Sequence, residues 1–163
     1  MVITTTRAST RASAGAAADD FAAFYARQHR DMVRLAFLLT HRQEVAEDLV
    51  HDCFVRIHPR WGSIVNPGGY LRQSVVNACR SHHRRAGREV DSVTEVPSVD
   101  RGPADPLWDA MARLPDRQRA VLVLRYYHDL SERDTAAVLR CRPGTVKSLT
   151  SRALAALREV IER

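Results

Sequence analysis

The sequence lacks any apolar run that approaches the roughly 18–20 residues of a membrane-spanning helix, and it shows no signal-peptide pattern. Its three cysteines, Cys53, Cys79 and Cys141, are far apart in sequence, which argues against a disulfide framework or a Cys-rich zinc site. Cys53 and Cys79 fall on apolar helical stripes, where small buried side chains are expected. We therefore expect a protein of the reducing cytoplasm with no membrane insertion.

Motifs of catalysis are also missing. The seven histidines have poor spacing for metal ligands, and His51, Cys53 and His58 do not share one face of their helix. No Walker loop, zinc spacing or nucleophile–base motif is present. We therefore expect no catalytic residue, no cofactor and no metal site, which disfavours an enzyme acting on nucleic acid.

Positive charge is divided between two blocks of the chain. The formal net charge is +6. Residues 19–88 and 107–163 each carry a net +4, whereas residues 89–106 carry a net −4. Basic blocks indicate a polyanionic partner such as nucleic acid, although ordinary surface charge is an alternative explanation.

Helical periodicity dominates the first half, and strand patterns are nearly absent. Apolar residues recur at intervals of three and four along residues 21–39, 45–57 and 70–79, which predicts three amphipathic helices. We expect them to form one module over residues 19–88. Residues 1–18 contain Ala, Ser, Thr and Arg without acid, and we expect a disordered tail, with an organelle transit peptide as the alternative.

The second half of the chain begins after a stretch that has no helical periodicity. Residues 89–106 are rich in Pro, Gly, Ser and Asp and are predicted to be a flexible linker. Residues 107–163 carry four shorter helical patterns, with Ser131 and Asp134 as a capping box and Thr145 as the N-cap of the last helix. The predicted fold class is all-α, with two small helical domains joined by this linker.

The last two helical patterns are separated by the short turn CRPG, which is typical of a helix-turn-helix motif. Ala136 and Ala137 would let the two helices cross closely. Short polar and cationic side chains would then face base edges and phosphates in a major groove. These residues are Arg142, Thr145, Lys147, Ser148, Ser151 and Arg152. A plain helical hairpin with a solvated polar face is the alternative.

The chain as a whole resembles the bacterial RNA polymerase sigma factors of the extracytoplasmic-function group. The resemblance covers about residues 20–161 in the family's order, through the stretches EVAEDLVHDCFVRI, NPGGYLRQSVVNACRSHHRR and LPDRQRAVLVLRYYHDLSERDTAAVLRCRPGTVKSLTSRALAALR. The segment TVKS…TSRAL is similar to the corresponding segment of an actinobacterial, sigma-E-like branch of this group. The resemblance implies a domain 2, a linker and a domain 4 that bind core RNA polymerase, recognise the −10 and −35 promoter elements and promote initiation, without catalysis by this chain.

The first of these stretches, EVAEDLVHDCFVRI, resembles the helix by which domain 2 binds the clamp helices of polymerase. The side chains that lie off its apolar stripe are expected to face polymerase. They are Glu47, Asp48, His51, Asp52 and Arg56. The family commonly has Gln where this chain has His51, and solvated helix charge is the alternative interpretation.

The second stretch resembles the loop that receives the −10 element and the helix behind it. A base that leaves the stack costs about a few kcal/mol, which a pocket and backbone contacts recover. The Pro-Gly-Gly loop would allow close approach of a nucleotide. The predicted −10 contacts are Trp61, Asn66, Pro67, Gly68, Tyr70, Arg72, Asn77, Arg80, Arg84 and Arg85. The alternatives are that Trp61 and Tyr70 occupy core positions and that the basic run is a solvated helix end.

The expected partners are core RNA polymerase, promoter DNA and, as in many members of the group, an anti-sigma factor that clamps between the domains. We expect a monomer when free, cytoplasmic, and nucleoid-associated within the holoenzyme. Leu149 stands where the family usually has Arg or Gln, so it is predicted to face DNA or an anti-sigma factor. The acidic linker would suit a positively lined channel, or would serve as a generic spacer. A helix-turn-helix regulator with a sensing domain is the rival function.

Overall fold

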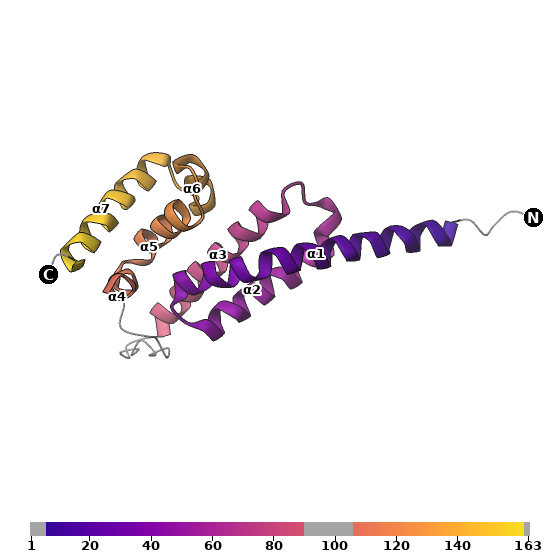
Figure 1. Cartoon of the computed structure of the whole chain (residues 1–163), viewed down its shortest axis with the longest axis horizontal. Helices are drawn as coiled ribbons and strands as arrows, with labels where there is room; N and C mark the ends of the chain where they lie inside the picture. Colours follow the sequence, from indigo (N-terminus) through magenta and orange to yellow (C-terminus); the bar gives the residue numbers. More distant parts are fainter. Residues whose placement is uncertain (1–5, 90–105, 162–163) are drawn as a thin grey trace, which may run out of the picture.

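The structure, a computed structural model, describes residues 6–89 and 106–161, with side chains placed over residues 20–86 and 107–160. Every element of regular structure within those ranges is a helix, and the predicted all-α fold is confirmed. Figure 1 shows two groups of helices side by side, α1 to α3 and α4 to α7. No helix in the described ranges is long and apolar enough to span a membrane.

The first group consists of α1 (Thr6–Thr40), α2 (Gln43–Ile57), the short 3-10 helix η1 (His58–Ser63) and α3 (Pro67–Glu89). Its core contains Met32, Leu35, Val50, Leu71 and Val75, all essentially inaccessible to solvent. Cys53 and Cys79 are buried in the same core, and burial raises the pKa of their thiols to about 11 and about 12. The apolar spacing in the sequence therefore identifies this core correctly.

The N-terminal prediction is wrong for part of its length. The backbone of residues 6–18 continues α1 in place of the predicted disordered tail, and residues 1–5 lie outside the described ranges. The alanines of this stretch have the highest helix propensity of any residue, which favours extension of an adjoining helix. The basic run at the end of α3 is likewise helical through Glu89.

The second group consists of α4 (Pro106–Arg113), α5 (Asp116–Leu122), the π-helical turn η2 (Val123–Tyr127), α6 (Glu132–Leu139) and α7 (Pro143–Ile161). The predicted cap of α6 is confirmed, because the Ser131 hydroxyl accepts a hydrogen bond from the Asp134 amide at 3.0 Å. The helix ends at Leu139, and the next residue, Arg140, has a φ of 51° in the left-handed region.

The prediction that Thr145 caps α7 is wrong. The helix begins at Pro143, three residues before the predicted start at Val146, and the carbonyl of Arg142 accepts hydrogen bonds from the amides of Thr145 and Val146. Proline suits the first position of a helix because its φ is already helical and its missing N–H would have no partner there.

The two groups of helices share one continuous core. A single cluster of buried residues runs from Met32 and Val75 in the first group to Leu124 and Val146 in the second, and α3 packs against α5 and α6. The predicted linker, residues 89–106, lies outside the described ranges except for its two end residues, which belong to α3 and α4.

Candidate polymerase and nucleic-acid interfaces

The side chains predicted to bind polymerase form the solvent-exposed face of α2. Glu47, Asp48, His51, Asp52 and Arg56 are all exposed, while Val50, Cys53 and Ile57 on the opposite face are buried. Asp52 and Arg56 form an ion pair at 3.8 Å between carboxylate and guanidinium. Because both side chains are largely exposed, this pair contributes little stability and leaves both groups available to a partner.

An apolar hollow of about 360 Å³ lies beside this charged face, and the sequence pattern did not reveal it. It is lined by Phe21, Tyr25, His51, Phe54, Val55 and His58. Val55 is 56% exposed, although it is a β-branched aliphatic residue in the last turn of α2. Its position off the buried stripe of α2 was the signal that could have identified it as a contact residue.

The Pro-Gly-Gly segment is the first turn of α3, and Asn66 is its cap. The Asn66 side-chain oxygen accepts a hydrogen bond from the Gly69 amide at 3.0 Å, and its carbonyl accepts one from Tyr70. A Cβ added at Gly69 would lie 2.8 Å from the Asn66 amide nitrogen, whereas one added at Gly68 would meet nothing within 4 Å. Gly69 is therefore required for the close approach of Asn66, and Gly68 is not.

These two glycines form a matched pair for mutagenesis. We expect the Gly69→Ala variant to be less stable than the Gly68→Ala variant by about 1 kcal/mol, the typical contribution of an N-cap. Both variants gain the same helix propensity, so their difference isolates the displaced Asn66 side chain. Urea denaturation of the two proteins measures it, and equal free energies of unfolding would show that Asn66 does not cap α3.

A hollow of about 450 Å³ lies beside this turn and provides space for a flat ligand. It is lined by Arg60, Ser63, Ile64, Val65, Asn66, Tyr70 and Gln73. Tyr70 is 42% exposed, so its ring is available for stacking. Of the two aromatic residues predicted here, the structure brings only Tyr70 to this hollow.

Trp61 packs into the core instead. Its ring lies 5.3 Å from that of Phe21 and 4.8 Å from that of Phe24, and the side chain is partly buried. This arrangement corresponds to the core alternative that the sequence left open. Aromatic rings in such clusters are held by edge-to-face and tilted contacts, which leave little freedom to stack on a base.

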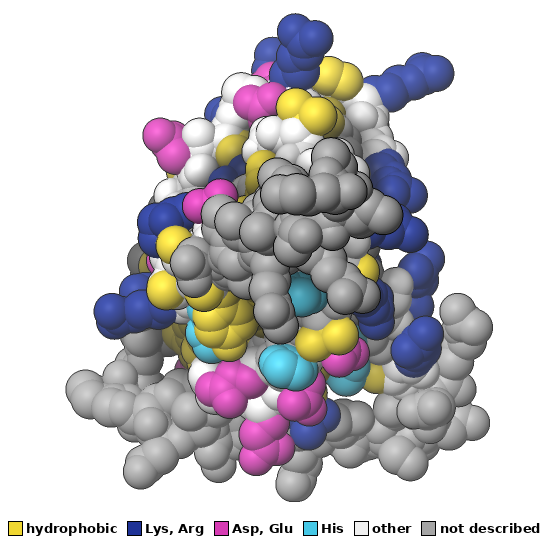
Figure 2. All heavy atoms as spheres, turned by 90° about the vertical axis from the view of Figure 1, so that its right-hand side faces the viewer, with side chains coloured by type: hydrophobic (Ala, Val, Ile, Leu, Met, Phe, Trp, Pro, Cys, Tyr) yellow, Lys and Arg dark blue, Asp and Glu magenta, His cyan; other side chains and the backbone are white. Residues whose placement is uncertain are grey.

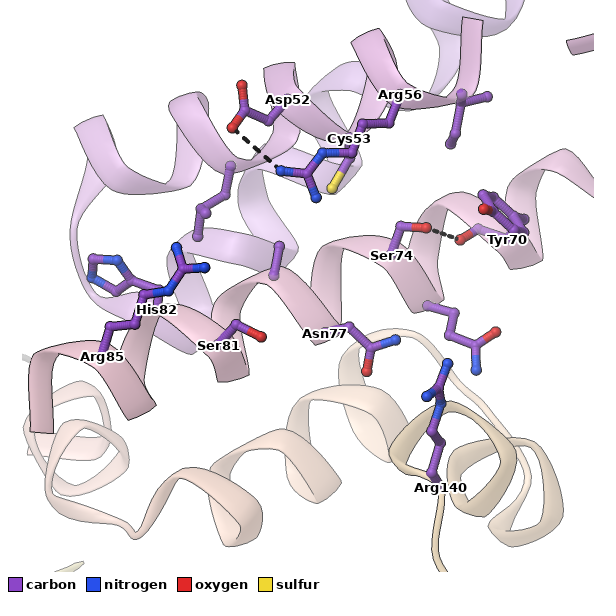
Figure 3. A pocket seen from close by; sticks show the side chains of 14 residues that line it. Asp52, Cys53, Arg56, Tyr70, Ser74, Asn77, Ser81, His82, Arg85 and Arg140 are labelled. Atoms are coloured by element: carbon purple, nitrogen blue, oxygen red, sulfur yellow. Dashed lines mark hydrogen bonds and ion pairs between the residues drawn. The ribbon is translucent and has the colours of Figure 1, made fainter. Parts of the chain in front are cut away.

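The predicted basic residues lie along α3, and Arg85 among them lines a groove of about 460 Å³ between α2 and α3 (Figure 3). Asn77 and Arg85 line this groove, together with Arg56 of α2 and Arg140 from the turn between α6 and α7. Arg84 is exposed and donates to the Ser81 hydroxyl at 2.9 Å. Arg72 and Arg80 are partly buried, and Arg80 donates to the Leu139 carbonyl at 3.3 Å.

The side chains predicted to read duplex DNA follow the turn before α7 and its outer face. Arg142, Lys147, Ser151 and Arg152 are exposed, and Thr145 and Ser148 are partly buried. The prediction that Leu149 faces DNA or a partner is wrong, because its side chain is only 9% exposed and belongs to the shared core. Seen from the N-terminal end of α1, Lys and Arg side chains line the top and both flanks, and acidic side chains lie both among them and near the bottom (Figure 2).

Comparison with known proteins settles the family. Residues 24–89 match the family "Sigma-70 region 2" and residues 104–157 match "Sigma-70, region 4". The chain belongs to the extracytoplasmic-function group of RNA polymerase sigma factors. It is 36% identical over 149 residues to the RNA polymerase sigma-E factor of Streptomyces avermitilis, covering 85% of this chain and 83% of the relative.

Further similarities agree with this assignment. This sigma factor is 34% identical over 150 residues to the ECF RNA polymerase sigma factor SigM of Mycobacterium tuberculosis, covering 86% of this chain and 76% of that protein. Its fold is similar to that of the sigma factor RpoE from Bartonella quintana, solved in complex with the anti-sigma factor NepR, with a TM-score of 0.74 and 28% identity over 88% of this chain and 97% of that one. Its function is promoter recognition in transcription initiation.

Proposed function

We propose that this sigma factor acts through three surfaces. The exposed face of α2 binds core RNA polymerase, the turn at Asn66 with the basic face of α3 holds the unwound −10 strand, and the outer face of α7 binds the −35 duplex. Residues 19–88 then correspond to domain 2 and residues 107–163 to domain 4. The observation that carries the proposal is the hollow between Asn66 and the exposed Tyr70, next to a groove lined by arginines.

The hollow and the groove would have different roles in strand opening, the hollow binding a base and the groove binding phosphates. A base taken out of the stack would enter the hollow, stack on Tyr70 and hydrogen-bond Asn66 through its amide NH2, since the amide oxygen already caps α3. Arg84 and Arg85 would neutralise the adjacent phosphates, joined by Arg72 and Arg80 when these are accessible. Trp61 packs against Phe21 and Phe24 in the core and is not proposed as a contact.

The chain supplies recognition and polymerase supplies the chemistry, so we propose no catalytic residue, cofactor or metal in it. Among the described residues, no three His, Cys, Asp or Glu side chains are grouped as metal ligands. We place the protein in the cytoplasm, monomeric when free and associated with the nucleoid in the holoenzyme.

The double variant Arg80→Ala with Arg84→Ala tests the α3 assignment. We expect promoter opening to fall at least tenfold while affinity for core polymerase stays unchanged, because α3 contributes phosphate contacts and α2 contributes the polymerase contact. Preassembled holoenzyme on a promoter of the host genome, probed by permanganate reactivity of unpaired thymines, measures opening. Arg27→Ala with Arg30→Ala on α1 removes the same charge as a control, and unchanged opening in the α3 variant would refute the assignment.

An anti-sigma factor is a further proposed partner, and an apolar groove of about 440 Å³ favours it. The groove is lined by Leu38, Leu107, Trp108, Met111, Leu122, Val123, Tyr126, Tyr127, Leu154 and Leu157. It contains side chains of both groups of helices, and Tyr126 is 63% exposed. An amphipathic helix of an anti-sigma factor would cover these rings and hold the two groups together.

A further inference from the structure

The hollow beside Asn66 has an apolar wall formed by a residue that the fold does not bury. Ile64 has an extended backbone, with a φ of −90° and a ψ of 113°, so the side chains of Ile64 and Val65 point to opposite sides of the chain. Ile64 is partly buried against the core, whereas Val65 is fully exposed and lines the hollow. The methyl groups of Val65 are therefore open to a ligand.

This apolar wall belongs to the same hollow as an available aromatic ring. Tyr70 lines the hollow with a 42% exposed side chain, on which a base can stack. A single exposed valine is ordinary on a protein surface, and its place in a hollow that also holds such a ring is what distinguishes Val65. A base stacked on Tyr70 would direct its edge at the other residues that line the hollow.

The orientation of the Asn66 amide is fixed by the helix that it caps. Its oxygen accepts the hydrogen bond from the Gly69 amide at 3.0 Å, and its nitrogen lies 2.8 Å from the position that a Cβ of Gly69 would occupy. Rotation of the amide group would turn the NH2 toward the Gly69 N–H and break the cap. Asn66 therefore offers a ligand a hydrogen-bond donor.

The Ser63 hydroxyl offers the opposite polarity. It donates its only proton to the Arg60 carbonyl at 2.9 Å, which leaves its oxygen as an acceptor. The guanidinium of Arg60 is exposed and is a donor only. The amide of Gln73, which also lines the hollow, contains both a donor and an acceptor and does not discriminate. Apart from Gln73, the hollow thus presents donors at Arg60 and Asn66 and an acceptor at Ser63.

We propose that the hollow selects thymine and that Val65 recognises its 5-methyl group. The inference rests on the proposed entry of a −10 base into the hollow. The Watson–Crick edge of thymine has a carbonyl acceptor on each side of an N–H donor, which complements the polarity of Arg60, Ser63 and Asn66. The methyl group lies next to the O4 carbonyl on the ring, as Val65 lies next to Asn66 in the chain. Val65 therefore contacts the methyl group while Asn66 donates to O4.

Three related pyrimidines separate the two contacts. Cytosine has an amino group in place of O4, so a donor would face the Asn66 NH2 group, and it lacks the methyl group. Uracil keeps the edge of thymine and lacks only the methyl group that Val65 would contact. 5-Methylcytosine has the methyl group on the edge of cytosine.

Binding of the holoenzyme to forked promoter DNA tests the selection. The fork is a promoter of the host genome whose non-template −10 strand is unpaired, and each position in turn carries one of the four bases, dU, 5-methyl-dC or an abasic site. At one position we expect dT to bind about fourfold more tightly than dU, the effect of one buried methyl group, and about tenfold or more above dC. 5-Methyl-dC should bind more tightly than dC and more weakly than dT.

Two variants assign this preference to the hollow. Val65→Ala should make dT and dU bind equally, while dT stays preferred over 5-methyl-dC. Asn66→Asp keeps the cap, because aspartate caps helices as well as asparagine, and replaces the donor by an acceptor. It should abolish the preference for dT over 5-methyl-dC. Val160→Ala, at an exposed valine near the end of α7, is the control and should keep both preferences.

The possible failures differ for the inference and for the proposed function. If the position at which Asn66→Asp alters base preference favours dC or a purine, the hollow binds a base but does not select thymine, and the inference is overturned. A preference for dT over dU that survives Val65→Ala overturns the role of Val65. If Asn66→Asp alters base preference at no position, and an abasic site at every position binds as tightly as the intact strand, no base enters the hollow and the proposed function of the hollow fails.

Discussion

Replacement of Arg119 by alanine is expected to lower the free energy of unfolding by about 3 kcal/mol, because several buried carbonyls lose their donor at once. The carbonyls of Met111, Ala112 and Leu114 mark the end of α4 and the turn into α5, and that of Leu39 ends α1. A buried acceptor without a partner costs its full desolvation free energy, which exceeds the net contribution of the hydrogen bond itself.

Urea denaturation measures this decrease, with two companion variants. Arg119→Lys should be destabilised nearly as much, since a single ammonium group cannot satisfy carbonyls in several directions as the planar guanidinium does. Arg117→Ala, an exposed arginine on the same helix, should stay within about 0.5 kcal/mol of the wild type. A wild-type free energy of unfolding for Arg119→Ala would contradict the structural role assigned to this residue.

The double variant Lys147→Ala with Arg152→Ala is expected to reduce transcription from promoters with a −35 element at least tenfold. Both side chains are exposed on the outer face of α7, where they would neutralise phosphates of the duplex. The logarithmic salt dependence of promoter binding by the holoenzyme should decrease in slope by about 2, because two phosphates of the duplex are no longer neutralised.

Arg158→Ala provides the control on the same helix, because Arg158 is exposed in the last turn of α7 and away from the helix-turn-helix. Its salt slope should equal that of the wild type. If the Lys147 and Arg152 double variant keeps both its transcription and its salt slope, the outer face of α7 does not bind the −35 element and another surface of domain 4 must do so.

The local features of this fold could be predicted from the sequence because their causes are local. Apolar spacing identified the helices, and Ser131 with Asp134 identified the start of α6. Leu149 shows the value of that spacing: Val146, Leu149, Ala153 and Leu157 recur at three and four, which predicts burial. Its assignment to DNA followed the resemblance instead, and the structure favours the spacing.

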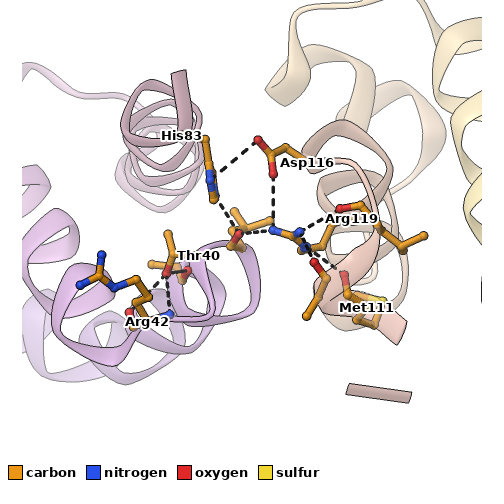
Figure 4. Close-up of polar contacts among 10 residues, drawn as sticks. Thr40, Arg42, His83, Met111, Asp116 and Arg119 are labelled. Atoms are coloured by element: carbon orange, nitrogen blue, oxygen red, sulfur yellow. Dashed lines mark hydrogen bonds and ion pairs between the residues drawn. The ribbon is translucent and has the colours of Figure 1, made fainter. Parts of the chain in front are cut away.

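The contact between the two groups of helices could not be predicted in this way. From the sequence, Arg119 would be placed on the protein surface, at the charged start of a helix. Nothing near it in sequence indicates a hydrogen bond to Leu39, 80 residues away (Figure 4). His41 adopts a φ of 57° at the end of α1, a conformation usually taken by glycine, so no glycine marks that helix end in the sequence. Long-range contacts of this kind depend on how two finished domains meet.

The covering of Arg72 and Arg80 also explains why single residues could be assigned only in part. Both satisfy the pattern of a phosphate contact, but both are partly buried, and Arg80 donates to the Leu139 carbonyl of the second group of helices. Arg84, Arg85 and Tyr70, in contrast, are exposed.

Runoff transcription with core RNA polymerase tests the central claim most directly. Purified core enzyme is incubated with a pool of upstream fragments from the host genome, with and without this chain. We predict discrete transcripts from a small set of fragments only when the chain is present. Identical products in its presence and absence, together with no capture of the chain by core enzyme, would contradict the account.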